Sequence, residues 1–142
     1  MRYAVALLFL VFLAPGSSRA AVCEGKKHPD VTALFLTEST KAGSAAEDWV
    51  SGFRDRIRDS GPYCIVPDKD KAAMVISIVG MDADASSTST AISIAIYTVR
   101  DNIFLDHWMY VADKESLPSS GDKAVAALQK EVKELKRLRM IH

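Results

Sequence analysis

The stretch from residue 73 to residue 111 constrains the fold most, because it contains three consecutive segments with the composition of β-strands. Residues 73–81 are nearly all apolar and rich in β-branched side chains, and the run is too short for a buried helix. This pattern predicts a strand near the middle of a sheet. Residues 90–99 alternate strictly in polarity, so that one face carries three isoleucines and needs a thick cover. These are Ile92, Ile94 and Ile96.

Residues 103–111 predict the last strand, and the short polar break at residues 100–102 implies an antiparallel hairpin. The alternation predicts two sets of side chains on this strand. We expect Ile103, Leu105, His107, Met109 and Val111 to face the helices. We expect Phe104, Asp106, Trp108 and Tyr110 to lie on the opposite, open face together with Tyr97.

The first twenty residues have the features of a secretory signal peptide. Arg2 precedes an apolar run over residues 4–14, and the small residues that follow predict cleavage after Ala20. The apolar run is shorter than the roughly 20 residues of a spanning helix. Cys23 lies near the cleavage site, but Val22 stands where a lipoprotein signal needs a small residue, so lipidation is not predicted. We therefore expect residues 21–142 to form a single soluble domain in the periplasm or outside the cell.

Charge and cysteine content describe the exported part further. Without Arg2 and Arg19, 16 basic residues face 18 acidic ones, and this balance favours neither nucleic acid nor a polybasic membrane contact. The two cysteines, Cys23 and Cys64, form an even pair in an oxidising compartment, which predicts a disulfide. The alternative, a reactive thiol, lacks a Cys-x-x-Cys motif or a local base.

The remaining segments predict two helices and two further strands. Residues 31–37 and 63–66 form the strands, and a helix between them begins at a capping box of Ser44 and Glu47 and ends at Gly61. Its apolar stripe is Ala46, Trp49, Val50, Phe53 and Ile57. A second helix follows Pro118, with Ser119 or Ser120 as its N-cap. Its stripe is Val125, Leu128, Val132, Leu135 and Leu138.

The predicted fold is α+β: a single mixed sheet in the order β-α-β-β-β-β-α with both helices on the isoleucine face. This order, with the strand Lys-Ala-Ala-Met-Val-Ile-Ser-Ile after a charged connection, resembles small α/β domains of bacterial envelope assembly proteins. Examples are the amino-terminal domain of TolB, the curli secretion lipoprotein CsgG and the penicillin-binding-protein activator LpoB. The chain has Lys71-Ala72-Ala73 where such domains often have Gly-Ala-Asp. The resemblance implies binding of proteins in the envelope.

No catalytic motif is present. Asp106 and His107 are neighbours on one strand, so they point to opposite faces, and no Gly-x-Ser-x-Gly surrounds a serine. The histidines lack metal-ligand spacing, and Asp82 and Asp84 lack the loop of a calcium site. We therefore expect no enzyme, metal or cofactor. The alternative is a small secreted hydrolase with a cleft formed by His107 and residues 82–90.

The function that the sequence favours is a non-catalytic binding or assembly module. Tyr97, Trp108 and Tyr110 would form an aromatic sheet face that binds an envelope protein or a glycan, because rings with polar tips suit such partners. The competing interpretation is a structural homodimer in which the same face meets a second subunit and no ligand binds.

Overall fold

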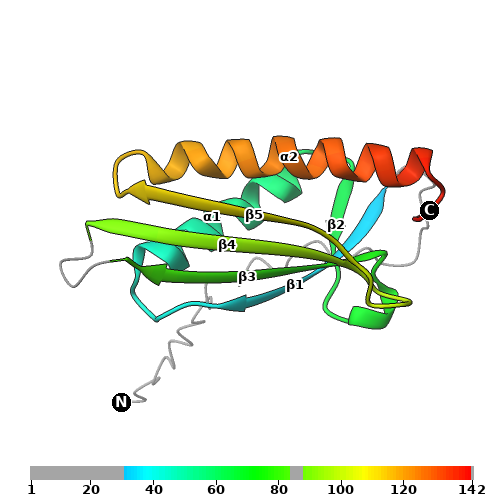
Figure 1. Ribbon diagram of the computed structural model, residues 1–142, viewed down its shortest axis with the longest axis horizontal. Helices are drawn as coiled ribbons and strands as arrows, with labels where there is room; N and C mark the ends of the chain where they lie inside the picture. Colours follow the sequence, from blue (N-terminus) through cyan, green and yellow to red (C-terminus); the bar gives the residue numbers. More distant parts are fainter. Residues whose placement is uncertain (1–30, 84–87, 142) are drawn as a thin grey trace, which may run out of the picture.

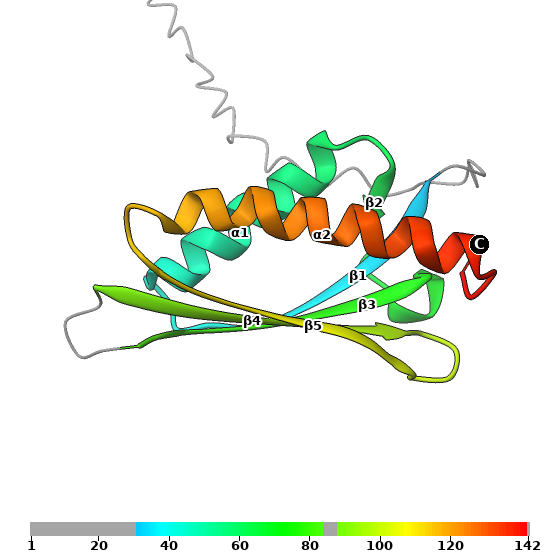
Figure 2. The same ribbon diagram turned by 45° about the horizontal axis from the view of Figure 1, so that its top comes forward.

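In the computed structural model, which describes residues 31–83 and 88–141, one mixed sheet carries two helices on the same face (Figures 1 and 2). The predicted element order is confirmed. It runs β1 (Thr32–Ser39), α1 (Ala45–Asp59), β2 (Tyr63–Ile65), β3 (Met74–Asp82), β4 (Ser89–Thr98), β5 (Phe104–Asp113) and α2 (Leu117–Arg137), with a 3-10 turn (Lys69–Lys71) before β3. The predicted signal peptide and Cys23 lie outside the described residues. Within the described ranges, no helix combines the length and the apolar character that crossing a membrane requires.

The strands lie in the order β2-β1-β3-β4-β5, with β3 at the centre as its nearly continuous apolar run predicts. β1 pairs in parallel with β2 and with β3, so the β1-α1-β2 unit is the expected crossover. β3, β4 and β5 pair antiparallel. The sheet edges among the described strands are therefore β2 and β5.

Helix α1 begins with the predicted cap. The Ser44 Oγ accepts a hydrogen bond from the Glu47 backbone N–H at 3.2 Å, but the Glu47 carboxylate accepts from Gly43 at 2.6 Å, whereas the Ser44 N–H donates to the Lys41 carbonyl. Gly61, just beyond the helix, has a φ of +79°, a conformation that costs glycine little. All five residues of the predicted stripe are buried: Ala46, Trp49, Val50, Phe53 and Ile57.

Helix α2 begins earlier than the sequence predicts. Its N-cap is Ser116, and Pro118 sits in the first turn, where its missing N–H costs no hydrogen bond. Ser120, one of the two predicted caps, is buried inside the helix, and its Oγ accepts a hydrogen bond from the Trp49 Nε1 of α1 at 2.8 Å. The last residue of the predicted stripe, Leu138, is exposed at the end of the helix; the other four are buried.

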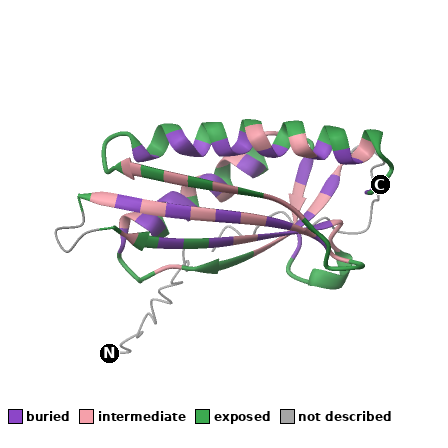
Figure 3. Cartoon of the chain, viewed as in Figure 1, coloured by how far each residue is buried: buried purple, intermediate pink, exposed green. Residues whose placement is uncertain are grey.

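The core lies between the sheet and the two helices. Ile92, Ile94 and Ile96 have no exposed surface, and in Figure 3 their strand shows the alternating bands of a half-covered sheet. Each such side chain contributes about 1.5–3 kcal/mol through burial. Helix α1 lies close against the sheet at Gly80, where an added Cβ would lie 2.5 Å from the Ala46 Cβ. The glycine is therefore required by the packing.

Candidate binding surface

A β-bulge in β5 decides which side chains of that strand face the helices. Ile96 is paired with Asp106, but its neighbour Tyr97 is paired with Phe104, so Leu105 is an extra residue on β5. Successive side chains of a strand point to opposite faces of the sheet. One extra residue therefore moves every later side chain of the strand to the other face. Beyond the bulge, Ile94 pairs with Trp108 and Ile92 pairs with Tyr110.

This register corrects the predicted face of β5. Trp108 and Tyr110 lie on the helix-covered face, where they pack against the core, and the Tyr110 ring lies 6.5 Å from the Trp49 ring of α1. His107, predicted to be covered, is exposed on the opposite face. Tyr97 lies on that opposite face and contacts Phe104 edge-on at 5.7 Å. The three aromatic residues therefore do not share one face, and their role in binding stays a prediction.

The face of the sheet opposite the helices, here called the uncovered face, is apolar and exposes large side chains. No helix in the described part of the chain lies over it (Figure 2). Met109 and Val111, predicted to face the helices, are instead 64% and 65% exposed here, and Met81 is 58% exposed. The ladder arranges β3, β4 and β5 residues of this face in rows. The rows are Val75–Tyr97–Phe104, Ser77–Ala95–His107, Val79–Ser93–Met109 and Met81–Ala91–Val111.

None of these four rows contains an Asp, Glu, Lys or Arg residue. Exposed apolar side chains that lie together usually mark interaction sites in soluble proteins. Sequence reasoning placed Met109 and Val111 on the wrong face because both faces of β5 are apolar. No residue type at Leu105 indicates a bulge.

Ser93 and His107 form the one polar contact that the structure describes within these rows. The Ser93 Oγ and the His107 Nε2 are 2.8 Å apart, which is the distance of a nucleophile and its base. In the described part of the chain, no carboxylate is hydrogen-bonded to the imidazole. The Asp106 carboxylate instead accepts from the His107 backbone N–H at 2.7 Å and from the Trp108 Nε1 at 2.7 Å. Ser93 and His107 are therefore placed like the nucleophile and the base of a hydrolase, but the carboxylate that orients the base is missing from this contact.

The covered side of β5 carries a group of acidic side chains close to α2. Partial burial raises the pKa of the Glu131 carboxyl, and the negative charges of Asp106 and Glu134 raise it further. Burial also raises the pKa of the Tyr110 hydroxyl, with a smaller contribution from Asp106. These shifts arise because ionised groups lose hydration against the helix. The negative charges of Asp106 and Glu131 therefore repel one another across the contact between β5 and α2.

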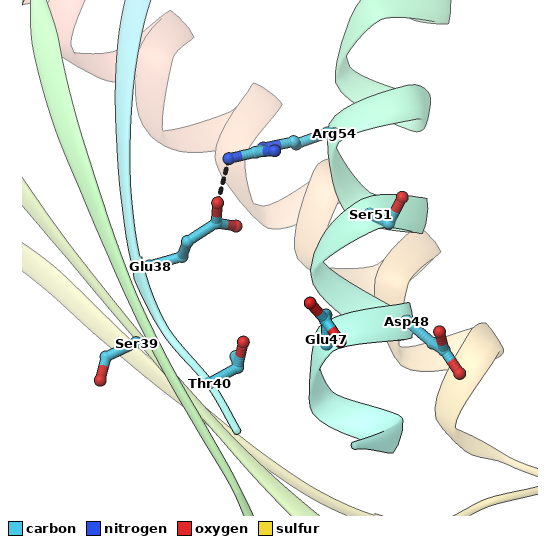
Figure 4. A pocket seen from close by; sticks show the side chains of 7 residues that line it. All are labelled: Glu38, Ser39, Thr40, Glu47, Asp48, Ser51 and Arg54. Carbon is cyan, nitrogen blue, oxygen red and sulfur yellow. Dashed lines mark hydrogen bonds and ion pairs between the residues drawn. The ribbon is translucent and has the colours of Figure 1, made fainter. Parts of the chain in front are cut away.

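A polar hollow of about 700 Å³ lies between the end of β1 and the first turns of α1 (Figure 4). Arg54 points across it and forms an ion pair with Glu38. The other lining residues are Ser39, Thr40, Glu47, Asp48 and Ser51. Within the described residues, no group of three or more ligand-type side chains has the arrangement of a metal site. Asp84, from the calcium pattern, lies outside the described residues.

Cys64 lies in β2, where its register partner is Ala33 of β1. The predicted partner of Cys64, Cys23, is outside the described residues, so the disulfide stays a prediction.

Comparison with known proteins shows the fold. No family model and no curated protein matches the chain. Among solved structures, TolB from Acinetobacter baumannii is similar, with a TM-score of 0.57 and 8% identity; the match covers 72% of this chain and 28% of TolB. Rare lipoprotein B from Shewanella oneidensis has a TM-score of 0.46 and 12% identity, over 73% of this chain and 98% of that protein. The PelC dodecamer from Paraburkholderia phytofirmans has a TM-score of 0.40 and 15% identity, over 65% of this chain and 79% of that protein.

The resemblance to envelope proteins that the element order indicates is therefore confirmed for TolB as a shared fold. The chain spans little more than a quarter of the TolB length. At these identities the similarity carries architecture and no residue-level function.

Proposed function

We propose that this chain is an exported envelope protein that acts without catalysis, as a binding or assembly module, through the uncovered face of its sheet. The observation that carries the proposal is the exposure of Met81, Met109 and Val111 in rows of the sheet face that contain no Asp, Glu, Lys or Arg residue. Burial of such side chains against a partner is favourable by about 25 cal/mol per Å² of apolar surface. The partner surface that fits is itself apolar and uncharged.

The location in the envelope is supported by two independent features. Residues 1–20 have the pattern of a secretory signal peptide. The fold resembles that of TolB, one of the envelope proteins whose small domains share this element order. Amino-terminal sequencing of the exported protein tests the leader: we expect the mature chain to begin at Ala21.

The proposed surface keeps one of the three aromatic residues that the sequence singled out. Tyr97 lies on the uncovered face beside Phe104, in the row at one end of the four. Trp108 and Tyr110 pack towards the helices, so they would affect binding only by holding β5 in place.

Site-specific crosslinking tests the surface. A photoreactive amino acid at position 109, on the uncovered face, is compared with one at position 129, an exposed position on α2, in cells that export the protein. We expect a defined adduct from position 109 and none from position 129, with its second component identified by mass spectrometry. Val111→Asp, on the same face, should abolish the adduct. Equal labelling from both positions, or no adduct from a folded protein at position 109, contradicts the proposal.

The hydrolase alternative rests on the contact between Ser93 and His107. An active pair would react with a fluorophosphonate probe at Ser93, and His107→Ala would remove that reaction. We expect no labelling above that of Ser93→Ala. Labelling of Ser93 that depends on His107 would favour the enzyme over the binding module.

A further inference from the structure

We propose that the outer edge of β5 binds an extended segment of a partner protein as an additional strand of the sheet. This segment has apolar side chains on the uncovered face and a lysine or arginine on the covered side, close to Asp106 and Glu131. The inference rests on the proposed function, because Met109 and Val111 of the uncovered face border the same edge. Three properties of the edge support it: its backbone groups, its lack of protection and its charge.

The hydrogen bonds of β4 show which of its residues bond to β5. The Ala83 N–H donates to the Ser89 carbonyl at 2.7 Å, so the odd-numbered residues of β4 bond to β3. The even-numbered residues of β4 therefore bond to β5. At the far end of the strand, the Thr98 N–H donates to the Ile103 carbonyl at 2.9 Å, which agrees with this assignment.

The backbone groups of alternate residues of β5 therefore point away from the sheet. Met109 and Val111 pair with odd-numbered residues of β4, so their N–H and C=O groups are directed outward. His107 belongs to the same set, and its N–H donates to the Asp106 carboxylate at 2.7 Å. Within the described residues, nothing accepts a hydrogen bond from the N–H of Met109 or Val111. An extended backbone presents carbonyl and N–H groups at the matching spacing, so it is the ligand that fits.

The two edges of the sheet differ in how they are protected. Proteins usually protect an edge with a short strand, with lysine or proline in it, or with a bulge. β2 is three residues long and lies between Pro62 and Pro67. β5 is ten residues long, contains neither lysine nor proline, and has its bulge near the start, at Leu105. Residues 107–113 therefore form a regular edge, and in Figure 2 α2 lies over the covered face and not alongside this edge.

The side chains of β5 define those of the added strand. Residues that pair across two strands lie on the same face of the sheet. A partner residue that pairs with Met109 or Val111 therefore lies on the uncovered face, where an apolar side chain covers these exposed residues. The alternate residues of the partner lie on the covered side, where Asp106 and Trp108 are their neighbours.

The covered side of β5 carries negative charge that the chain does not neutralise. Burial, then the charges of Asp106 and Glu134, raise the pKa of Glu131. Lys130 has a smaller, opposite effect. Among the residues that the structure describes, no lysine or arginine forms an ion pair with Asp106 or Glu131. A lysine or arginine of the partner supplies this missing charge. A second copy of β5 does not, because the strand contains Asp106 and Asp113 but neither lysine nor arginine.

Site-specific crosslinking from both sides of β5 tests the added strand. Photoreactive amino acids are placed at position 109, on the uncovered face, and at position 127, one turn before Glu131 on α2, in cells that export the protein. We expect adducts to the same partner from both positions. The crosslinked peptide should alternate apolar residues with others that include a lysine or arginine. Position 129, on the exposed surface of α2, is the control and should give no adduct.

A proline at the edge tests the backbone bonds. Val111→Pro removes an outward N–H and no hydrogen bond to β4, and edge strands accept proline at such positions. It should lower the yield of the adduct from position 109 at least tenfold. Val111→Ala keeps the N–H and should lower the yield less than threefold. Circular dichroism checks the fold of both variants, and if Val111→Pro does not fold, position 127 decides.

The outcomes separate this inference from the proposed function. An adduct from position 109 that Val111→Asp abolishes, without one from position 127, rejects the added strand and leaves the proposed function standing. Full yield from folded Val111→Pro protein, or a second copy of this chain in the adduct, also overturns the inference. No adduct from either position rejects both. Hydrogen exchange adds a check on the free protein: slow exchange of the Met109 and Val111 amides would contradict an open edge.

Discussion

Both faces of the sheet carry large apolar side chains, but within the described part of the chain helices cover only one of them. On the covered face, three isoleucines of β4 meet two amphipathic helices and lose all contact with solvent. On the other face, methionine and valine side chains of β3 and β5 stay exposed next to small residues of β4. Composition therefore does not distinguish a core face from a binding face. The number of helices distinguishes the two faces, because two helices suffice to cover only one of them.

The largest contrast between the faces concerns stability. Phe53→Ala and Leu128→Ala should each lower the free energy of unfolding by about 3–5 kcal/mol, since both residues are fully buried in the helical layer. Met109→Ala, on the uncovered face, should change it by less than about 0.5 kcal/mol. Urea midpoints of the three variants measure the difference. Equal losses at all three positions would mean that both faces are covered.

The predicted disulfide would attach the segment around Cys23 to β2, which lies at an edge of the sheet. A bond between Cys23 and Cys64 closes a loop of about 40 residues and should stabilise the exported protein by about 2–4 kcal/mol. Intact mass under denaturing conditions, with alkylation before and after reduction, detects the bond. Two thiols that react with the alkylating agent without reductant would exclude it. Cys64→Ser then measures its contribution to stability.

The bulge of β5 is tested by two neighbouring residues. Trp108→Ala should lower the free energy of unfolding by about 2 kcal/mol, because the half-buried ring packs against the core and its Nε1 donates to Asp106. His107→Ala, on the exposed side, should cost less than about 0.5 kcal/mol. Thermal unfolding of the pair checks the order. A greater loss of stability for His107→Ala would support the register that is expected without the bulge.

The fold was predictable because periodicity and turn residues agree along most of the chain. The alternation of β4, the buried stripe around Phe53 and the turn at Gly61 each determine a local structure that the tertiary packing keeps. The face of β5 was not predictable, because a single extra residue at Leu105 exchanges its two sides and both sides are apolar. The start of α2 was missed for a related reason: Ser116, Ser119 and Ser120 all suit an N-cap, and tertiary contacts decide among them.

A smaller effect is expected from Glu131 on the covered side, whose contribution to stability depends on pH. The raised pKa of Glu131 means that the folded protein binds this proton more tightly than the unfolded chain does. The contribution of Glu131 to stability therefore falls as pH rises from the ordinary glutamate pKa through the raised one. At neutral pH, Glu131→Gln should stabilise the protein by a few tenths of a kcal/mol, since solvent screens much of the effect. Below about pH 4, near the ordinary glutamate pKa, the gain should vanish.

The matched control for this change is Glu134, whose pKa is lowered because its carboxylate accepts hydrogen bonds from Arg137. Its contribution is present above the ordinary pKa and is lost as pH falls through the lowered one. Glu134→Gln should therefore have the opposite sign at neutral pH. Urea midpoints measured between pH 3 and pH 8 compare the two variants. The same sign for both would contradict the assignment of the shifts.

Methionine oxidation tests the contrast between the two faces most directly, because each face carries its own probe. Met81 and Met109 lie on the uncovered face, whereas Met74 has no exposed surface on the covered one. In dilute peroxide at low protein concentration, peptide mass spectrometry should show Met81 and Met109 oxidised nearly as fast as in the unfolded chain. Met74 should react at least tenfold more slowly. Protection of Met109 equal to that of Met74 in the dilute protein would contradict an uncovered face.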